Sequence, residues 1–234
     1  MSQNVSVLSE AFYSVRLRIE SAANRVGRDS SEITLVAVSK SVSLDTVIAA
    51  HELGVRVFGE SRVQDAAAKF GERKLEGATL HMVGQLQSNK AQEAVAAFDL
   101  IESVDRHNLI EALQRYAARN GRVLPVLVQV NTAREARKAG CAPEETSSIV
   151  RAVRTCPNLE LHGLMTIAPL LPMPGAARPH FRALHDLRDR LGTEMDCADD
   201  LRVLSMGMSD DFEEAIEEGA THVRIGRALF APNS

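Results

Sequence analysis

The first residue whose type and position suggest chemistry is Lys40, which ends the apolar run ITLVAVS over residues 33–39. A short apolar run rich in β-branched residues predicts a buried strand. Where such a strand ends at a barrel mouth, desolvation lowers the pKa of a lysine amine and favours its neutral, nucleophilic form. A lysine at a strand end is more often a solvated charge, so Lys40 indicates a function only together with a second feature.

That second feature follows two predicted strands near the C-terminus, in SMGMSDDFEEA (205–215) and RIGRALF (224–230). Loops in these positions of a barrel often hold a phosphate with backbone amides, hydroxyls and positive charge. The candidate residues are Ser205, Gly207, Ser209, Arg224, Gly226 and Arg227. The structural alternative is that Ser209 or Asp210 begins a helix and that Gly226 makes a tight turn.

Lys40 and these loops together indicate a more specific ligand than either does alone. A phosphorylated aldehyde needs an amine that forms an aldimine with it and loops that hold its phosphate. We therefore predict that the chain binds pyridoxal 5′-phosphate (PLP) covalently through Lys40, with the phosphate in the two C-terminal loops. No GxGxxG or GxxxxGK[ST] segment indicates a dinucleotide or P-loop nucleotide site.

The elements that must position these residues alternate along the chain between strand-like and helical segments, which indicates βα units around a parallel sheet. The predicted strands are 33–39, 56–60, 79–84, 100–103, 123–131, 159–165, 201–206 and 221–226. Helices are predicted over 5–26, 44–54, 106–121 and 143–155, with Gly54 and Gly121 at helix ends. Pro125 counts against a regular fifth strand. Eight units favour an α/β fold, a single-domain (β/α)8 TIM barrel over residues 1–234 with an additional N-terminal helix; an open doubly wound sheet is the alternative.

Composition excludes several classes of function. The 234 residues carry a net charge of −4 with lysines and arginines scattered along the chain, which argues against a nucleic-acid partner. No apolar run approaches the roughly 18 residues that a membrane span needs. Three cysteines without CxxC spacing favour a reducing compartment, so we expect a cytoplasmic protein. The spacing of His180 and His185 does not suit two metal ligands on one helical face, so we expect no metal site.

Eight ordered segments of the sequence resemble the pyridoxal phosphate homeostasis proteins, whose barrel is similar to the N-terminal domain of alanine racemase. They are LVAVSK (35–40), FGESRVQD (58–65), HMVGQLQSNK (81–90), SVDR (103–106), VQVN (128–131), GLMTI (163–167), LSMGMSDDFEEAI (204–216) and VRIGRALF (223–230). The chain departs from the family's usual residues at Ser61, Arg62, Leu80, Arg227 and Ala231. The resemblance implies that Lys40 is the aldimine lysine and that Ser205, Arg224, Gly226 and Arg227 surround the phosphate.

The function implied by the resemblance is PLP homeostasis: the protein holds the reactive aldehyde and delivers it to PLP-dependent enzymes, without robust catalysis of its own. A racemase-like PLP enzyme is the alternative, and it needs a second acid/base group. In similar racemases that group is a tyrosine from a further β-domain, which we expect to be absent; Tyr13 and Tyr116 are predicted on outer helices. A phosphosugar-binding barrel, with Lys40 as a charge partner, is a third reading.

Two further segments carry expectations. Lys90 is the chief competitor of Lys40 as the PLP-binding lysine, although on an early helical turn it is expected to face solvent or a carboxylate. The segment PLLPMPGAARP (169–179) is expected to be a loop on the catalytic face, either a lid or a plain surface loop.

Overall fold

Eight parallel strands form a closed barrel in chain order, and β8 pairs with β1 to complete it. The computed structural model describes residues 2–71, 75–135, 137–169 and 173–231. The strands are β1 (Thr34–Val38), β2 (Val57–Glu60), β3 (Thr79–Met82), β4 (Leu100–Val104), β5 (Leu124–Gln129), β6 (Leu159–Met165), β7 (Val203–Ser205) and β8 (His222–Ile225). The predicted barrel is therefore confirmed, and the open doubly wound sheet is excluded.

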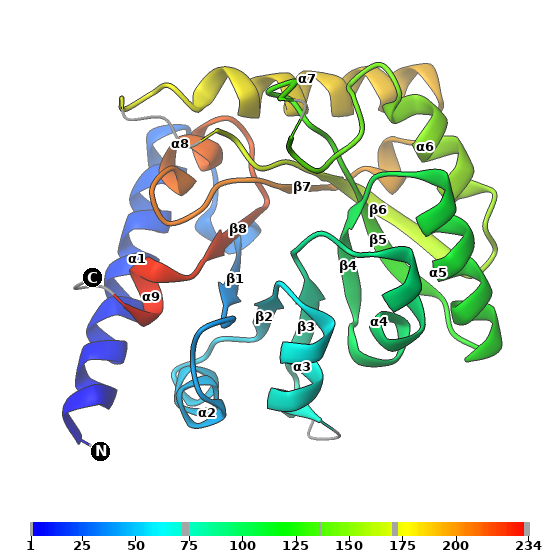
Figure 1. Cartoon of the computed structure of the whole chain (residues 1–234). Coiled ribbons are helices and arrows are strands. Elements are labelled where there is room, and N and C mark those ends of the chain that lie inside the picture. Colours follow the sequence, from blue (N-terminus) through cyan, green and yellow to red (C-terminus); the bar gives the residue numbers. More distant parts are fainter. Residues whose placement is uncertain (1, 72–74, 136, 170–172, 232–234) are drawn as a thin grey trace.

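Helices surround the barrel on its outside (Figure 1). In the described part of the chain they are α1 (Ser2–Arg25), α2 (Leu44–Glu52), α3 (Val63–Phe70), α4 (Ala91–Ala97), α5 (His107–Arg119), α6 (Thr146–Arg154), α7 (Arg178–Glu194), α8 (Phe212–Glu217) and α9 (Arg227–Phe230), with short 3-10 turns η1 (Ser30–Glu32), η2 (Ser88–Lys90) and η3 (Ala198–Asp200). The additional N-terminal helix is confirmed as α1, which runs beside α8 and α9. No helix in the described ranges is both long and apolar enough to cross a membrane.

Local signals in the sequence account for several of these boundaries. Gly54 and Gly121 have φ values of 104° and 60°, a left-handed conformation that glycine adopts without strain, and each follows the end of a helix as predicted. Pro125 does not interrupt β5: it lies near the start of the strand, opposite Glu160 of β6, and the register shifts between Val126 and Leu127. The proline therefore coincides with a local irregularity and not with the end of the strand.

Alternation along the strands divides the apolar side chains between two cores. The larger core lies between strands and helices and includes Leu35 and Ala37 of β1. The smaller core lies inside the barrel and consists of Leu100, Leu127 and Met165. Successive side chains of a strand point to opposite faces, so the residues that alternate with the larger core line the barrel interior.

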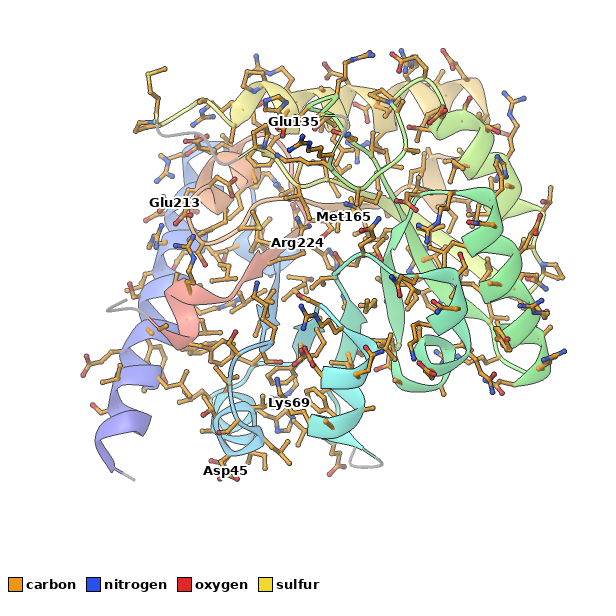
Figure 2. The ribbon with its side chains drawn as sticks, in the orientation of Figure 1. Asp45, Lys69, Glu135, Met165, Glu213 and Arg224 are labelled. Atoms are coloured by element: carbon orange, nitrogen blue, oxygen red, sulfur yellow. The ribbon has the colours of Figure 1, made fainter. Side chains whose placement is uncertain are left out.

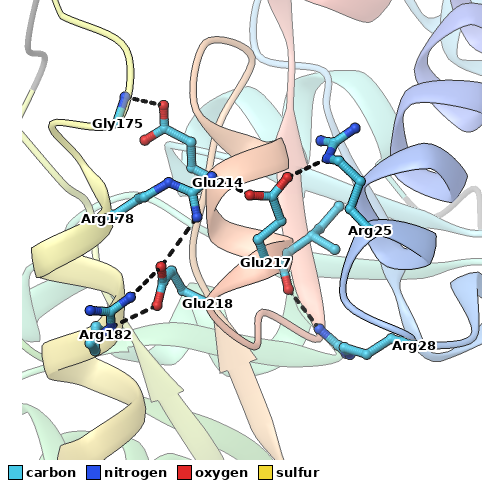
Figure 3. Close-up of polar contacts among 9 residues, drawn as sticks. Arg25, Arg28, Gly175, Arg178, Arg182, Glu214, Glu217 and Glu218 are labelled. Carbon is cyan, nitrogen blue, oxygen red and sulfur yellow. Dashed lines mark hydrogen bonds and ion pairs between the residues drawn. The ribbon is translucent and has the colours of Figure 1, made fainter.

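A network of arginines and glutamates fastens α8 to α1 and α7 (Figure 3). Glu217 accepts from Arg25 of α1 at 2.6 Å and from Arg178 of α7, while Glu218 pairs with Arg182 at 3.0 Å. Of the predicted loop 169–179, residues 170–172 lie outside the described residues, and α7 already begins at Arg178. The amide of Gly175 in this segment donates to Glu214 of α8 at 2.6 Å.

Candidate functional site

Lys40 lies immediately after β1, at the carboxyl end of the barrel, and its side chain is exposed. Its amine makes no hydrogen bond or ion pair with any residue that the structure describes. The backbone that carries it is held in place, because the amide of Ser39 donates to the carbonyl of Gly59 at 2.9 Å and the amide of Val42 donates to the carbonyl of Ser39 at 3.1 Å. Within the described ranges, Lys40 therefore presents an unpaired amine from a turn that backbone hydrogen bonds hold in place.

Behind this turn, on the helix side of the barrel wall, lies a buried ion pair between Lys69 of α3 and Glu60 of β2. We call Lys69 and Glu60 the outer pair. The Lys69 Nζ is 2.6 Å from Oε1 of Glu60, and the same oxygen accepts from the hydroxyl of Ser39 at 2.7 Å. Lys69 also donates to the backbone carbonyl of Ser39. The outer pair thus ties α3 to the ends of β1 and β2, directly before Lys40.

Three of the predicted phosphate residues meet beside β1 and form what we call the rim group: Ser209, Gly226 and Arg227. The hydroxyl oxygen of Ser209, in the turn after β7, accepts from the amide of Ala228 at 3.2 Å. Arg227, which begins α9, pairs with Asp210, and both side chains are exposed. A Cβ on Gly226 would lie 3.2 Å from the carbonyl oxygen of Val38. The ends of β1, β7 and β8 therefore come together closely, as the phosphate prediction requires.

Two more of the predicted residues, Ser205 and Arg224, lie deeper and are buried inside the barrel, while Gly207 has a φ of 91° and packs against Ala215. Nη1 of Arg224 donates to the hydroxyl of Ser205 at 2.6 Å, and that hydroxyl donates to Oε2 of Glu102 at 2.6 Å. The second carboxylate oxygen of Glu102 is 2.8 Å from Nδ1 of His81. We call these four residues the interior network. Its members come from β3, β4, β7 and β8, so the barrel wall itself positions them.

Strand register separates the rim group from the interior network. Ser205 of β7 lies opposite His222 of β8, four residues before Gly226. At the rise of a β-strand this is roughly 13 Å along β8. The structure therefore brings Ser205 together with Arg224 and not with Ser209, although both serines belong to the same SMGMS segment.

Charge in the interior is set by burial and by these contacts. Burial raises the pKa of Glu102, but the hydrogen bond and charge of His81, the charge of Arg224 and the hydroxyl of Ser205 outweigh it and lower the pKa to about 2. Burial lowers the pKa of Arg224, and the nearby Glu102 carboxylate opposes that shift. Burial also lowers the pKa of His222 to about 4. The interior therefore contains a carboxylate, a guanidinium cation and, near neutral pH, an uncharged His222.

The structure also shows where the remaining residues considered from the sequence lie. His81 is hydrogen-bonded to Glu102, Lys90 pairs with Glu93 at 3.0 Å, and Tyr13 and Tyr116 lie on α1 and α5 outside the barrel. A cavity of about 420 Å³ opens beside the ends of β2 and β3 and is lined in part by Ser61, Arg62 and Lys90. Among the described residues, no group of His, Cys, Asp and Glu has the arrangement of a metal site.

Sequence reasoning missed Glu102, Glu60 and Lys69. The two glutamates occur inside apolar strand runs, LIES and VFGE, where a charge is conspicuous and needs a partner. That signal was present in the sequence. The identity of each partner was not, because it depends on which face of the strand each glutamate occupies.

The closed parallel barrel with a polar interior is a TIM barrel, and comparison with known proteins identifies the family to which it belongs. The family model described as alanine racemase, N-terminal domain, matches residues 15–234. The chain is 42% identical over 213 residues to the pyridoxal phosphate homeostasis protein of Aquifex aeolicus, covering 91% of this chain and 92% of that protein. It is 41% identical over 226 residues to that of Pseudomonas aeruginosa, covering 97% and 96%. The chain belongs to the pyridoxal phosphate homeostasis protein family.

Solved structures agree with this assignment. PipY of Synechococcus elongatus, solved with PLP bound, is 34% identical with a TM-score of 0.82, and the match covers 96% of this chain and 100% of that one. An alanine racemase of Clostridium difficile is 11% identical with a TM-score of 0.74, covering 96% of this chain but 56% of the racemase, so it shares the fold alone.

Proposed function

We propose that this protein binds PLP, holds it as an aldimine on Lys40, and acts in PLP homeostasis. The observation that carries the proposal is the amine of Lys40, which has no partner among the described residues and lies at the carboxyl end of β1, beside the rim group. PLP supplies an aldehyde whose carbonyl carbon condenses with a neutral amine and releases water. An amine that has no carboxylate partner loses no ion pair when it reacts, which distinguishes Lys40 from Lys90 and Lys69.

The rim group suits the phosphate of PLP by the chemistry of its donors. Ser209 uses its hydroxyl oxygen as an acceptor and retains its proton for donation. Arg227 can contribute charge-assisted hydrogen bonds, because its ion pair with Asp210 is exposed and exposed pairs are weak. Gly226 allows the backbone to approach closely where a Cβ would meet Val38. We assign these three residues to the phosphate, and Ser205 and Arg224 to the deeper part of the same site.

We further propose that PLP bound here is stored and passed to PLP-dependent enzymes in the cytoplasm, with little turnover of amino acids. Racemisation needs an acid/base group on each face of the cofactor. Tyr13 and Tyr116 lie on outer helices, remote from the barrel interior. The names of the relatives support a homeostatic role over the racemase alternative.

Borohydride reduction tests the proposal directly. The purified protein is mixed with PLP, its visible absorbance is recorded, the sample is reduced, and the labelled peptide is identified by mass spectrometry. We expect Schiff-base absorbance before reduction and the label on Lys40. Lys90 is the internal control, since its ion pair with Glu93 disfavours reaction. Label on another lysine with Lys40 unmodified, or the absence of Schiff-base absorbance, would contradict the assignment.

A separate measurement tests the proposed lack of turnover. Alanine is incubated in deuterated water with the PLP-loaded protein, and exchange at Cα is followed by NMR. We expect no exchange above the rate with free PLP. Rapid exchange that is lost on reduction of the Lys40 adduct would support the racemase alternative instead.

A further inference from the structure

Ser39, the residue directly before Lys40, has every one of its polar groups bonded. Its amide donates to the carbonyl of Gly59 at 2.9 Å, and its hydroxyl donates to Oε1 of Glu60 at 2.7 Å. Its carbonyl accepts from Nζ of Lys69. Ser39 is fully buried, whereas Lys40 is exposed and its amine has no partner in the described ranges. A residue that is held on all sides therefore immediately precedes the unpaired amine.

The side of the wall on which Ser39 is held determines the direction of Lys40. Along β1, Leu35 and Ala37 belong to the core between strands and helices, so alternation places Ser39 on the same helix side. Its bond to Glu60, which pairs with a residue of α3, agrees with that placement. The same alternation directs the next residue, Lys40, toward the barrel interior. A Ser39 side chain that left the helix side would turn Lys40 away from that interior.

The groups that hold Ser39 are costly to bury, which points to a role beyond packing. Taking the charges of Glu60 and Lys69 out of water carries a desolvation penalty, and a buried ion pair offsets it only when its remaining atoms are also bonded. Oε2 of Glu60 is buried and has no hydrogen-bond partner among the described residues. An apolar pair of similar volume would join α3 to β2 without this penalty. Such a pair would lack the acceptor and the donor that hold Ser39.

We propose that Glu60 and Lys69 are positioning residues that act through Ser39 to hold Lys40 toward the barrel interior. The inference rests on the proposed function, because it concerns the lysine to which we assign PLP. An amine that is held in its reactive direction is competent for a larger fraction of the time, and the apparent affinity for an aldehyde rises with that fraction. In this arrangement neither Glu60 nor Lys69 contacts the cofactor, since their ion pair lies on the helix side of the wall.

Two serines between β1 and α2 provide a matched test. Ser39→Ala removes the hydroxyl that donates to Glu60. Ser43→Ala is the control, because the hydroxyl of Ser43 caps α2 and its bonds are made to Thr46. Both variants should lower stability in urea, since each loses a hydrogen bond. In a PLP titration followed by Schiff-base absorbance, we expect Ser39→Ala to weaken binding about fivefold and Ser43→Ala by less than about twofold.

Further measurements distinguish a loss of position from a general loosening of the barrel. Inorganic phosphate probes the rim group without involving Lys40, so Ser39→Ala should change phosphate affinity by less than about twofold. In a protein that already carries Lys40→Ala, adding Ser39→Ala should cause no further loss of PLP binding in equilibrium dialysis, because both changes act through one amine. The induced circular dichroism of bound PLP, which depends on how the cofactor is held, should decrease in Ser39→Ala and not in Ser43→Ala.

A second variant tests the contact on the other side of Ser39. Lys69→Met removes the donor to the Ser39 carbonyl and to Glu60. We expect it to weaken PLP binding about tenfold, because it removes two hydrogen bonds where Ser39→Ala removes one. As with Ser39→Ala, the loss should disappear in the Lys40→Ala background.

The outcomes separate this inference from the proposed function. A wild-type protein that carries no label on Lys40 after treatment with PLP and borohydride overturns both. If the wild type is labelled there, but Ser39→Ala and Lys69→Met bind PLP no more weakly than Ser43→Ala, the inference alone is overturned. A loss that persists in the Lys40→Ala background, or that affects inorganic phosphate equally, also overturns it, since a purely structural role has that result. Should Lys69→Met fail to fold, the comparison of Ser39→Ala with Ser43→Ala decides alone.

Discussion

Two glutamates are buried in this barrel, Glu60 on β2 and Glu102 on β4, and they face opposite sides of its wall. Glu60 points toward the helices and pairs with Lys69 of α3. Glu102 points into the barrel and is bound by His81 and Ser205, with Arg224 nearby. Figure 2 shows Lys69 beside α2 and α3, and Arg224 near the centre of the barrel.

The two sites differ in how completely the carboxylate is satisfied. Oε2 of Glu60 has no hydrogen-bond partner in the described part of the chain, whereas both oxygens of Glu102 have one. Glu60 also uses a partner from a helix, while Glu102 uses partners from the strands. We infer that a charge pair across the wall fastens two layers of the fold, and that a network within the wall preorganises a ligand site.

The largest expected effect comes from removing the cation of the interior network. Arg224→Met leaves the carboxylate of Glu102 buried without its counter-charge, and breaking such a pair costs about 3–5 kcal/mol. We expect the free energy of unfolding, measured in urea at neutral pH, to fall by an amount in that range. Pairing Arg224→Met with Glu102→Gln should recover part of the loss. A loss below about 1 kcal/mol would mean that Glu102 is balanced by other groups.

Removing the cation of the outer pair should cost less. Lys69→Met leaves Glu60 without its ion-pair partner, but Lys69 is 11% exposed and water can partly replace it. We expect a loss of about 2–3 kcal/mol in the same urea experiment, below that for Arg224→Met. An equal or larger loss would reverse the ranking of the two sites. Lys90→Ala, which breaks the exposed pair with Glu93, serves as the control and should cost less than about 1 kcal/mol.

This comparison also shows where sequence reasoning succeeds. The eight strands were predictable because each is a short apolar run between turn signals, and their ends lie within two residues of the predicted positions. The placement of Lys40 and the Gly226 loop at the same end of the barrel was predictable because strand ends of a barrel meet at one face, whereas their role toward a ligand stays a prediction. The local sequence pattern was sufficient to predict the strands and the end of the barrel at which these residues lie.

The interior network was not predictable, because it depends on depth inside the barrel. Ser205 and Ser209 are four residues apart in one segment, and the sequence gives them the same chemistry. Ser205 belongs to β7 and Ser209 to the turn after it, so the closed barrel places them at different levels. Likewise, Glu102 lies 21 residues after His81 and 103 before Ser205, and only strand pairing brings the three together.

Lowering the pH should reduce the free energy of unfolding, because Glu102 of the interior network becomes protonated. The pKa of Glu102 is lowered from its ordinary 4.5 to about 2, so its ionisation stabilises the folded state above about pH 4.5, and this stabilisation is lost as pH falls toward 2. About 2 kcal/mol of it should be lost by pH 3. Urea unfolding of the wild type and Glu102→Gln at pH 7 and pH 3 measures this. The variant should show a smaller difference between the two pH values, and equal differences would mean that Glu102 does not contribute.

The smallest expected effect on stability lies in the rim group, and it separates stability from ligand binding. Arg227 is 66% exposed, and its ion pair in the described part of the chain is with the half-exposed Asp210, so Arg227→Met should change the free energy of unfolding by less than about 0.5 kcal/mol. The same variant should weaken binding of inorganic phosphate severalfold, because a guanidinium forms charge-assisted hydrogen bonds with a phosphate. Arg182→Met is a matched control: Arg182 is also 66% exposed and ion-paired, but it lies on α7 and contacts Glu218. If both variants leave phosphate affinity unchanged, Arg227 has no part in the phosphate site. If only Arg227→Met weakens it, the rim binds ligand with residues that add little to stability, unlike the interior beneath it.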